Sequence, residues 1–200
     1  KPPRHEAPSN RINAGIYILD KEVLKYIPAN REVSIERETF PLLIQEGVGV
    51  YGAVIEGYWM DMGTTDRYRQ AHWDILDGQM PLAIPGTRRK DGIYLGKNVQ
   101  IGRGVTLNPP VLIGNHVILE ENSIIGPYVV IGDHSRIGSG TSCSRSIIWD
   151  NTAIAPRSNL VNCILCDHLL TGPDQMMHGA VIKLKVPRRT AQKPVKTAVA

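Results

Sequence analysis

The second half of the chain carries an apolar pattern with a strict period of six residues. A helix repeats near 3.6 residues and a strand near 2, so neither element makes this period. The pattern instead predicts a unit of one short strand and one turn, stacked many times, with its aliphatic side chains pointing inward. Eight positions share the period: Leu95, Ile101, Leu107, Ile113, Leu119, Ile125, Ile131 and Ile137.

Small and turn-forming residues accompany this column. A second apolar column lies two residues upstream, at Val99, Val105, Val111, Val117 and Val129. Glycine follows six of the eight aliphatic residues, where a β-carbon would obstruct the corner of a coil. Asparagine and aspartate, which suit turns, lie between the strands at Asn98, Asn115, Asn122 and Asp133. Three strand-turn units would make a triangular coil, and such coils are stable only as a stack.

The pattern changes after Ile137. Residues 139–146 are small and polar and break the phase, and apolar groups then return at 147–148, 154, 160 and 164–165. Terminal repeats are usually atypical, so we expect one or two further, less regular coils here.

The first ninety residues predict a mixed α/β segment. Alternating apolar residues favour strands at 12–19 and 48–55. Capping residues and terminating glycines favour a short helix beginning at 21–26 and longer helices over 34–47 and 64–78. Residues 81–90 are expected to form a loop into the repeats.

Charge and cysteine content narrow the function classes. The net charge is +4, but residues 183–200 hold six basic and no acidic residues, which leaves −2 for the rest. We interpret this as a solvated basic tail, so we expect neither a nucleic-acid partner nor a membrane partner. The cysteines are Cys143, Cys163 and Cys166, and the last two form a lone CxxC that does not by itself predict zinc. With no signal-peptide pattern, they fit a reducing cytoplasm.

Asp61 is the candidate site residue that the order of elements singles out. It lies in the loop GYWMDMG, between a predicted strand and a predicted helix. Ligands bind at such junctions in open α/β sheets, but an aspartate before a helix can equally be a simple N-cap. The residues alone leave both readings open.

The order of motifs carries a family resemblance. INAGIYIL, SIERETFP and GYWMDMGTTDRYRQAHWDIL precede the hexapeptide repeats. This order resembles the C-terminal part of the sugar-nucleotide pyrophosphorylases, nearest to the mannose-1-phosphate guanylyltransferases. The resemblance implies the α/β remnant of a Rossmann-like nucleotidyltransferase domain followed by an all-β left-handed β-helix. The left hand comes from the resemblance, since general connection rules favour the right hand.

The resemblance also implies a reaction and a set of site residues. The family joins a nucleoside triphosphate to a sugar-1-phosphate and releases pyrophosphate. Asp61 matches its Mg²⁺-binding aspartate, and Asn13 and Gly15 match its sugar-contacting NAG motif. Lys1 matches the lysine of an EKP motif that meets the sugar phosphate. The glycine-rich GxGxRL triphosphate loop is missing, so we expect a fragment of a longer enzyme that is inactive alone.

We therefore expect four segments. Residues 1–80 are the C-terminal part of the catalytic domain, 81–91 a linker, 92–182 the left-handed β-helix and 183–200 the basic tail. The expected activity is GTP plus mannose-1-phosphate giving GDP-mannose, in a cytoplasmic homo-oligomer. The alternatives are a glucose-1-phosphate thymidylyl-, uridylyl- or adenylyltransferase, a non-catalytic regulatory homologue, and a hexapeptide acyltransferase that uses His116 or His134 as a base.

Overall fold

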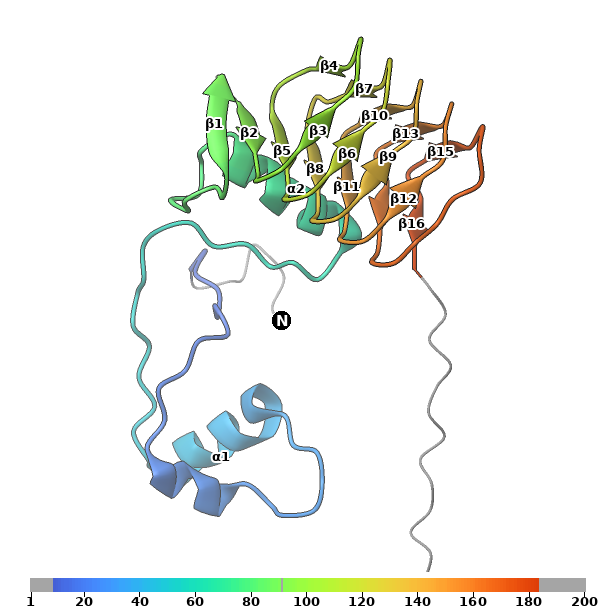
Figure 1. The fold of residues 1–200 in the computed structure, drawn as a ribbon. Coiled ribbons are helices and arrows are strands. Elements are labelled where there is room, and N and C mark those ends of the chain that lie inside the picture. The colour runs from blue at the N-terminus through green and yellow to red at the C-terminus, as the bar shows by residue number, and fades with distance from the viewer. Residues whose placement is uncertain (1–8, 91, 184–200) are drawn as a thin grey trace, which may run out of the picture. The chain divides into compact units, whose positions relative to one another are not determined.

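The computed structural model describes residues 9–90 and 92–183. The chain divides into two compact units, and the boundary in the sequence lies between Trp59 and Met60. Figure 1 labels the helices and strands of both units. In the part of the chain that the structure describes, no helix has the length and apolarity needed to cross a membrane.

The first unit is built around short helices. The 3-10 helix η2 spans Lys21–Tyr26, and the π-helical turn η3 (Ile35–Thr39) leads directly into helix α1 (Phe40–Gln45). The predicted caps are present, because the Ser34 hydroxyl accepts a hydrogen bond from the Arg37 N–H at 3.3 Å. The helices expected near 21–26 and 34–47 are therefore confirmed.

The two strands predicted in this unit are wrong. The described residues before Thr87 include no strand, so 12–19 and 48–55 are extended but unpaired. A strand needs a hydrogen-bonded neighbour, and the described residues 9–59 of this unit supply none. The apolar side chains of these segments are accordingly exposed, for example Ile18 and Ile16. Alternation predicted the shape of the segments but could not supply their partners.

The second unit contains a parallel β-solenoid with three sheets. One sheet has the order β1 (Thr87–Lys90), β2 (Ile93–Leu95), β5 (Val111–Ile113), β8 (Val129–Ile131), β11 (Ser146–Ile148), β14 (Ile164–Leu165), β16 (Val181–Ile182). A second has β15 (Met176–His178), β13 (Asn159–Val161), β10 (Ser142–Ser144), β7 (Ile124–Ile125), β4 (Thr106–Leu107). The third has β12 (Ala153–Ile154), β9 (Arg136–Ile137), β6 (Ile118–Leu119), β3 (Gln100–Ile101).

The strand order confirms triangular coils. From β2 to β14, each strand except β12 pairs in parallel with the strand of its own sheet in the next coil, as β2 does with β5 and β5 with β8. Their registers place Leu95, Ile113 and Ile131 in one column. Strand β12 ends its sheet, and its next contact is a parallel bridge between Ala153 and Leu170. The exception to parallel pairing is β1, which pairs antiparallel with β2 at the end of a segment expected to be a loop. The left hand of the coils stays a prediction from the family.

The six-residue column forms the core, except at two positions of the first coil. Ile113, Ile125 and Ile137 are fully buried, and Leu119 and Ile131 are 1% exposed. Ile101 is 48% exposed and Leu107 is half-buried, contrary to the expectation for all eight. The difference has a physical cause, because β3 and β4 are the end strands of their sheets and have no coil beneath them.

Glycine is needed in the coils because neighbouring coils approach closely. A β-carbon on Gly102 would lie 2.7 Å from the Glu121 backbone nitrogen, and one on Gly132 would lie 2.6 Å from that of Asp150. These two glycines do not have positive φ. The left-handed corner positions are taken instead by side chains such as Asn98 (φ 55°).

The repeat continues through the segment that was expected to break it. Cys143 lies six residues after Ile137, is fully buried and takes the next core position in β10. Steps of five residues then lead to Ile148 and from Leu160 to Leu165, and these side chains also belong to the core. The core column therefore continues through Cys143, and the predicted break in phase takes the form of the five-residue step that follows it. The expected less regular coils are present and extend to β16.

Helix α2 (Thr65–Leu76) packs on the outer face of the solenoid's seven-stranded sheet (Figure 1). The middle residues of β5, β8 and β11 point away from the core, and in β11 this residue is Ile147. Ile147 is nevertheless only 2% exposed, which fits a helix covering that face. The helix predicted over 64–78 is confirmed and belongs to the same compact unit as the solenoid.

Candidate functional site

The loop at Asn13 is ordered by its own side chain. The Asn13 Oδ1 atom accepts a hydrogen bond from the Gly15 N–H at 2.9 Å, and Gly15 has a φ of 72°. A side chain at position 15 would be strained at this φ, although nothing lies within 4 Å of where its β-carbon would be. The loop therefore offers open backbone beside a side-chain amide.

A carboxylate and a phenol hold the amide of Asn13. The Asn13 Nδ2 atom donates to the Tyr17 hydroxyl at 2.9 Å and to Glu36 Oε1 at 3.3 Å. The Tyr17 hydroxyl itself donates to Glu36 Oε1 at 2.5 Å. This hydrogen bond stabilises the protonated phenol and raises the pKa of Tyr17 above its ordinary value. Three polar side chains thus form one exposed network.

Two members of this network have no local signal in the sequence. Tyr17 lies in the segment predicted as a strand over 12–19, and Glu36 lies near the start of the helix predicted over 34–47. Tyr17 also packs edge-on against Phe40, with ring centroids 5.0 Å apart. The pairing joins residues 19 apart in the sequence, so no local pattern signalled it.

The loop at Asp61 forms a tight turn before α2. The Asp61 Oδ1 atom accepts a hydrogen bond from the Gly63 N–H at 3.1 Å. The N-cap of α2 is Thr64, whose hydroxyl accepts from the Arg67 N–H at 3.3 Å. Asp61 is therefore not the N-cap of this helix, and the simple capping role left open by the sequence is excluded.

The carboxylate of Asp61 suits a hard divalent cation as one ligand among several. It is exposed, and an anionic oxygen is the donor that Mg²⁺ prefers. Within residues 9–90 and 92–183, no cluster of three His, Cys, Asp or Glu side chains is arranged to hold a metal. Any ion here would need oxygen ligands beyond this carboxylate, and Mg²⁺ ordinarily takes these from substrate phosphates and water.

The structure brings together some of the predicted site residues. Asn13 and Gly15 share one hydrogen-bonded turn in the first unit. Asp61 lies in the second unit, at the start of α2. Lys1 lies outside the described residues.

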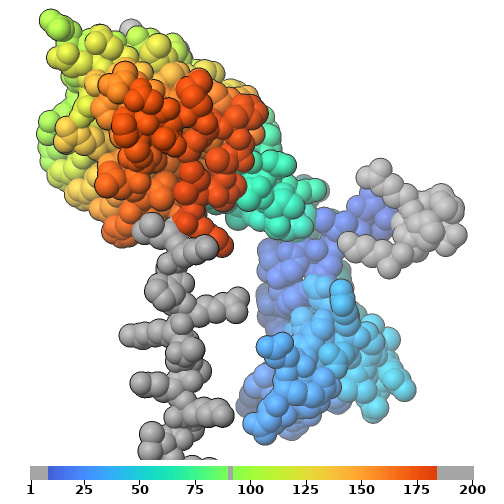
Figure 2. All heavy atoms as spheres, turned by 90° about the vertical axis from the view of Figure 1, so that its right-hand side faces the viewer, coloured from blue at the N-terminus to red at the C-terminus, as the bar shows by residue number. Residues whose placement is uncertain are grey.

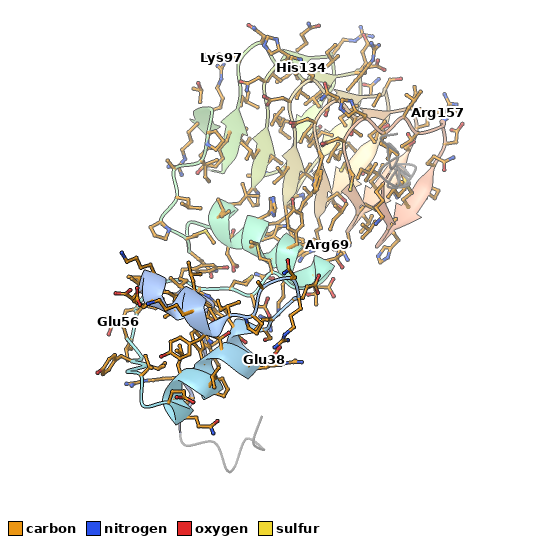
Figure 3. The ribbon with its side chains drawn as sticks, turned by 90° about the horizontal axis from the view of Figure 1, so that it is seen from below. Glu38, Glu56, Arg69, Lys97, His134 and Arg157 are labelled. Atoms are coloured by element: carbon orange, nitrogen blue, oxygen red, sulfur yellow. The ribbon has the colours of Figure 1, made fainter. Side chains whose placement is uncertain are left out.

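The histidines considered for acyl transfer are part of a corner ladder. The rings of His116 and His134 stack with centroids 4.8 Å apart and planes within 2° of parallel. Beside them, hydrogen bonds from Asn115 to Asp133 hold the pKa of that carboxyl below its usual value. Figure 3 shows His134 on the side of the solenoid away from α2. Parallel stacked rings of this kind do not converge on a reacting atom, so this arrangement does not support a catalytic base.

Comparison with known proteins assigns both parts of the chain. The "Nucleotidyl transferase" family matches residues 1–78, and the "GMPPB C-terminal domain" family matches residues 107–183. A mannose-1-phosphate guanylyltransferase of Mycobacterium tuberculosis is 35% identical over 116 residues, covering 52% of this chain and 32% of that protein.

Two further relatives are also sugar-1-phosphate nucleotidyltransferases by name, and they match different shares of this chain. A UTP–glucose-1-phosphate uridylyltransferase of Synechocystis is 37% identical over 100 residues, covering 50% of this chain and 26% of the relative. A mannose-1-phosphate guanyltransferase of Eremothecium gossypii is 54% identical over 54 residues, covering 27% and 14%. The aligned region thus spans a third or less of each of these relatives. Together with the β-solenoid and the nucleotidyl transferase segment before it, these matches support the sugar-nucleotide pyrophosphorylase family for this chain.

Proposed function

We propose that the protein containing this chain transfers a nucleotidyl group from a nucleoside triphosphate to a sugar-1-phosphate. In this reaction an oxygen of the sugar phosphate attacks the α-phosphorus, the bond between the α- and β-phosphates breaks, and pyrophosphate leaves. The most specific form of the proposal is GTP plus mannose-1-phosphate giving GDP-mannose. It is supported by the names of the guanylyltransferase relatives and by the GMPPB-type C-terminal match.

The observation that carries the proposal is the position of the Asp61 carboxylate and its hydrogen bonding. Its carboxylate follows an extended segment, precedes a helix, and is not used to cap that helix. Two anions must approach each other in this reaction, so catalysis depends on positioning and charge neutralisation. A divalent cation held there would neutralise phosphate charge. In the proposal, Asp61 supplies one of the ligands for that cation.

The first unit supplies sugar recognition in this proposal. An amide both donates and accepts hydrogen bonds, so the Asn13 side chain can bind a sugar hydroxyl. The bare backbone at Gly15 allows close approach of the sugar. Tyr17 and Glu36 orient the amide by accepting hydrogen bonds from its Nδ2 atom. Lys1 would meet the sugar phosphate as a point charge.

The proposal extends to the assembly and location of the whole protein. We propose a homo-oligomer that associates through the solenoid, because exposed strand edges such as those at β3 and β4 need pairing or cover. We also propose a cytoplasmic enzyme, which the three free cysteines support. The 200-residue chain alone is expected to be inactive.

A second substrate pair has one specific observation in its favour. The uridylyltransferase relative matches half of this chain at 37% identity, close to the guanylyltransferase figure. UTP plus glucose-1-phosphate is therefore the runner-up, and Asp61 would have the same role in both reactions.

Steady-state kinetics of Asp61→Asn in the full-length protein tests the proposal. Asparagine keeps the shape and the acceptor for the Gly63 N–H but removes the charge. Turnover should fall by about 10²-fold or more and the requirement for Mg²⁺ should rise. The matched control is Asp167→Asn, the same change at an exposed aspartate of the solenoid, which should change turnover little. Unchanged turnover of Asp61→Asn at low Mg²⁺ would contradict the assignment.

A further inference from the structure

Helix α2 is attached to the solenoid along both of its halves. In its first half, the Tyr68 ring lies 6.4 Å from the Trp149 ring, and burial raises the pKa of Tyr68. In its second half, the Trp73 ring lies 5.9 Å from the Tyr128 ring. Just past its end, the Asp77 carboxylate accepts a hydrogen bond from the Tyr128 hydroxyl at 3.1 Å. The helix is therefore held at several points and cannot tilt freely on the sheet.

Arg145 clamps the second half of the helix. Its guanidinium carbon lies 4.3 Å from the Trp73 ring centroid and 5.4 Å from that of Tyr128. Both distances are within the range of favourable cation–π contact. The corner that carries Arg145 is fixed, since the Arg145 N–H donates to the Pro127 carbonyl at 2.8 Å and Arg145 has a φ of 46°. Arg145, an exposed residue of the solenoid, thus makes a cation–π contact with Trp73 of α2.

The start of α2 is joined tightly to the Asp61 loop. Only Met62 and Gly63 separate Asp61 from the Thr64 cap, and the Asp61–Gly63 hydrogen bond closes this turn. In the first turn, Arg69 donates to the Asp66 carboxylate at 2.7 Å, and the Arg69 side chain is only 4% exposed. Figure 3 shows Arg69 on α2, and Figure 2 shows the teal segment that begins α2 against the solenoid's coils. A shift of the helix would therefore move the Asp61 carboxylate with it.

We propose that the solenoid positions Asp61 through α2, with Arg145, Tyr128 and Trp149 as positioning residues for the metal-binding loop. This inference rests on the proposed function, because it assigns a purpose to the placement of Asp61. The contacts given above for these three residues are with α2 and with Asp77 just past its end, so they act through the helix. Misplacement of a reacting group by about 1 Å can cost roughly 10²-fold in rate, so even a modest change in helix seating is measurable.

These contacts are dispensable for the solenoid itself. Trp149 is 38% exposed and Arg145 is exposed, and neither belongs to the stacked core. Removing the Arg145 side chain leaves the core columns and the backbone bonds between coils in place. The solenoid is then expected to fold normally while α2 and the Asp61 loop become more mobile.

The experiment compares Arg145→Ala with Arg103→Ala in the full-length protein. Arg103 is also an exposed solenoid arginine, 3.8 Å from Glu121, and it makes no aromatic contact with α2. Hydrogen–deuterium exchange over residues 60–68 is the first readout, and the Mg²⁺ concentration for half-maximal activity is the second. Tyr128→Phe, which removes only the hydroxyl bound to Asp77, and the pair Trp149→Ala and Trp149→Phe complete the set.

We expect exchange at 60–68 to rise about tenfold in Arg145→Ala, with smaller rises in Tyr128→Phe and Trp149→Ala. The Mg²⁺ requirement should rise in the same order, whereas Arg103→Ala and Trp149→Phe should resemble the parent. Equal exchange at 60–68 in Arg145→Ala and Arg103→Ala would overturn the inference. A rise spread evenly over the whole solenoid would also overturn it, because that is general destabilisation. Exchange decides this inference, whereas the Asp61→Asn kinetics decides the proposed function.

Discussion

Ile113 and Ile101 both occupy positions of the six-residue repeat but should respond very differently to truncation of the side chain. Ile113 is fully buried between Leu95 and Ile131, which pair with it in register from the coils on either side. Ile101 is 48% exposed, because it lies in β3 at the open end of its sheet. Ile113→Ala and Ile101→Ala therefore make the same chemical change in two different environments.

The expected magnitudes follow from burial. Ile→Ala removes three carbon groups, whose transfer from water contributes roughly 2.4 kcal/mol when all are buried. At position 113 a cavity adds to this loss, so the free energy of unfolding should fall by about 3–4 kcal/mol. At position 101 about half of the transfer term is lost and no closed cavity forms, so the fall should be about 1 kcal/mol. We expect a difference of roughly 2–3 kcal/mol between the variants.

Urea unfolding of the purified chain, followed by far-UV circular dichroism, measures this difference. The urea concentration at the midpoint of solenoid unfolding should fall strongly for Ile113→Ala and little for Ile101→Ala. The dependence of the unfolding free energy on urea concentration should be similar in the two variants. Equal losses in the two variants would refute the assigned stacking, since a coil with a neighbour on one side only cannot lose as much as one enclosed on both sides. A larger loss for Ile101→Ala would refute the position of the open end.

Two further predictions concern titration and assembly. Burial raises the pKa of the Cys143 thiol from its ordinary value of 9.0 to about 12, so between those pH values the unfolded chain loses a proton that the folded chain retains. Stability from this group is therefore full below pH 9 and falls as pH rises, by up to about 1.4 kcal/mol per pH unit, and urea midpoints at pH 7.5 and 10 should show a steeper fall for the parent than for Cys143→Ala. Light scattering should show a smaller assembly when the full-length protein is truncated after Lys90, and an unchanged oligomeric state would contradict association through the solenoid.

The features that sequence could predict are those determined within one repeat. The column from Ile113 to Ile137 was visible because each coil presents an aliphatic residue at the same step. The exposure of Ile101 was not visible, because it depends on what stacks beneath β3 rather than on the residue. Cys143 was overlooked as a core residue because its neighbours are polar, although a free cysteine behaves as a small hydrophobe.

Contacts between distant segments account for the rest. The segments at 12–19 and 48–55 have the alternation of strands but no partner in their unit. The Asn13, Tyr17 and Glu36 network and the packing of α2 on the solenoid also join residues far apart in the chain. Local patterns identify helix starts, which is why the helix beginning near residue 64 was predicted. The choice between Asp61 and Thr64 as its N-cap needed the structure.

The most direct measurement of the central claim is the product formed by the full-length protein. Incubation with GTP, mannose-1-phosphate and Mg²⁺, followed by chromatography with mass detection, should yield GDP-mannose and pyrophosphate in equal amounts. Omitting either substrate should abolish both products, and UTP with glucose-1-phosphate should be used more slowly. The account would be contradicted if no pair of nucleoside triphosphate and sugar-1-phosphate yields a nucleotide sugar, or if the protein instead transfers an acetyl group from acetyl-CoA.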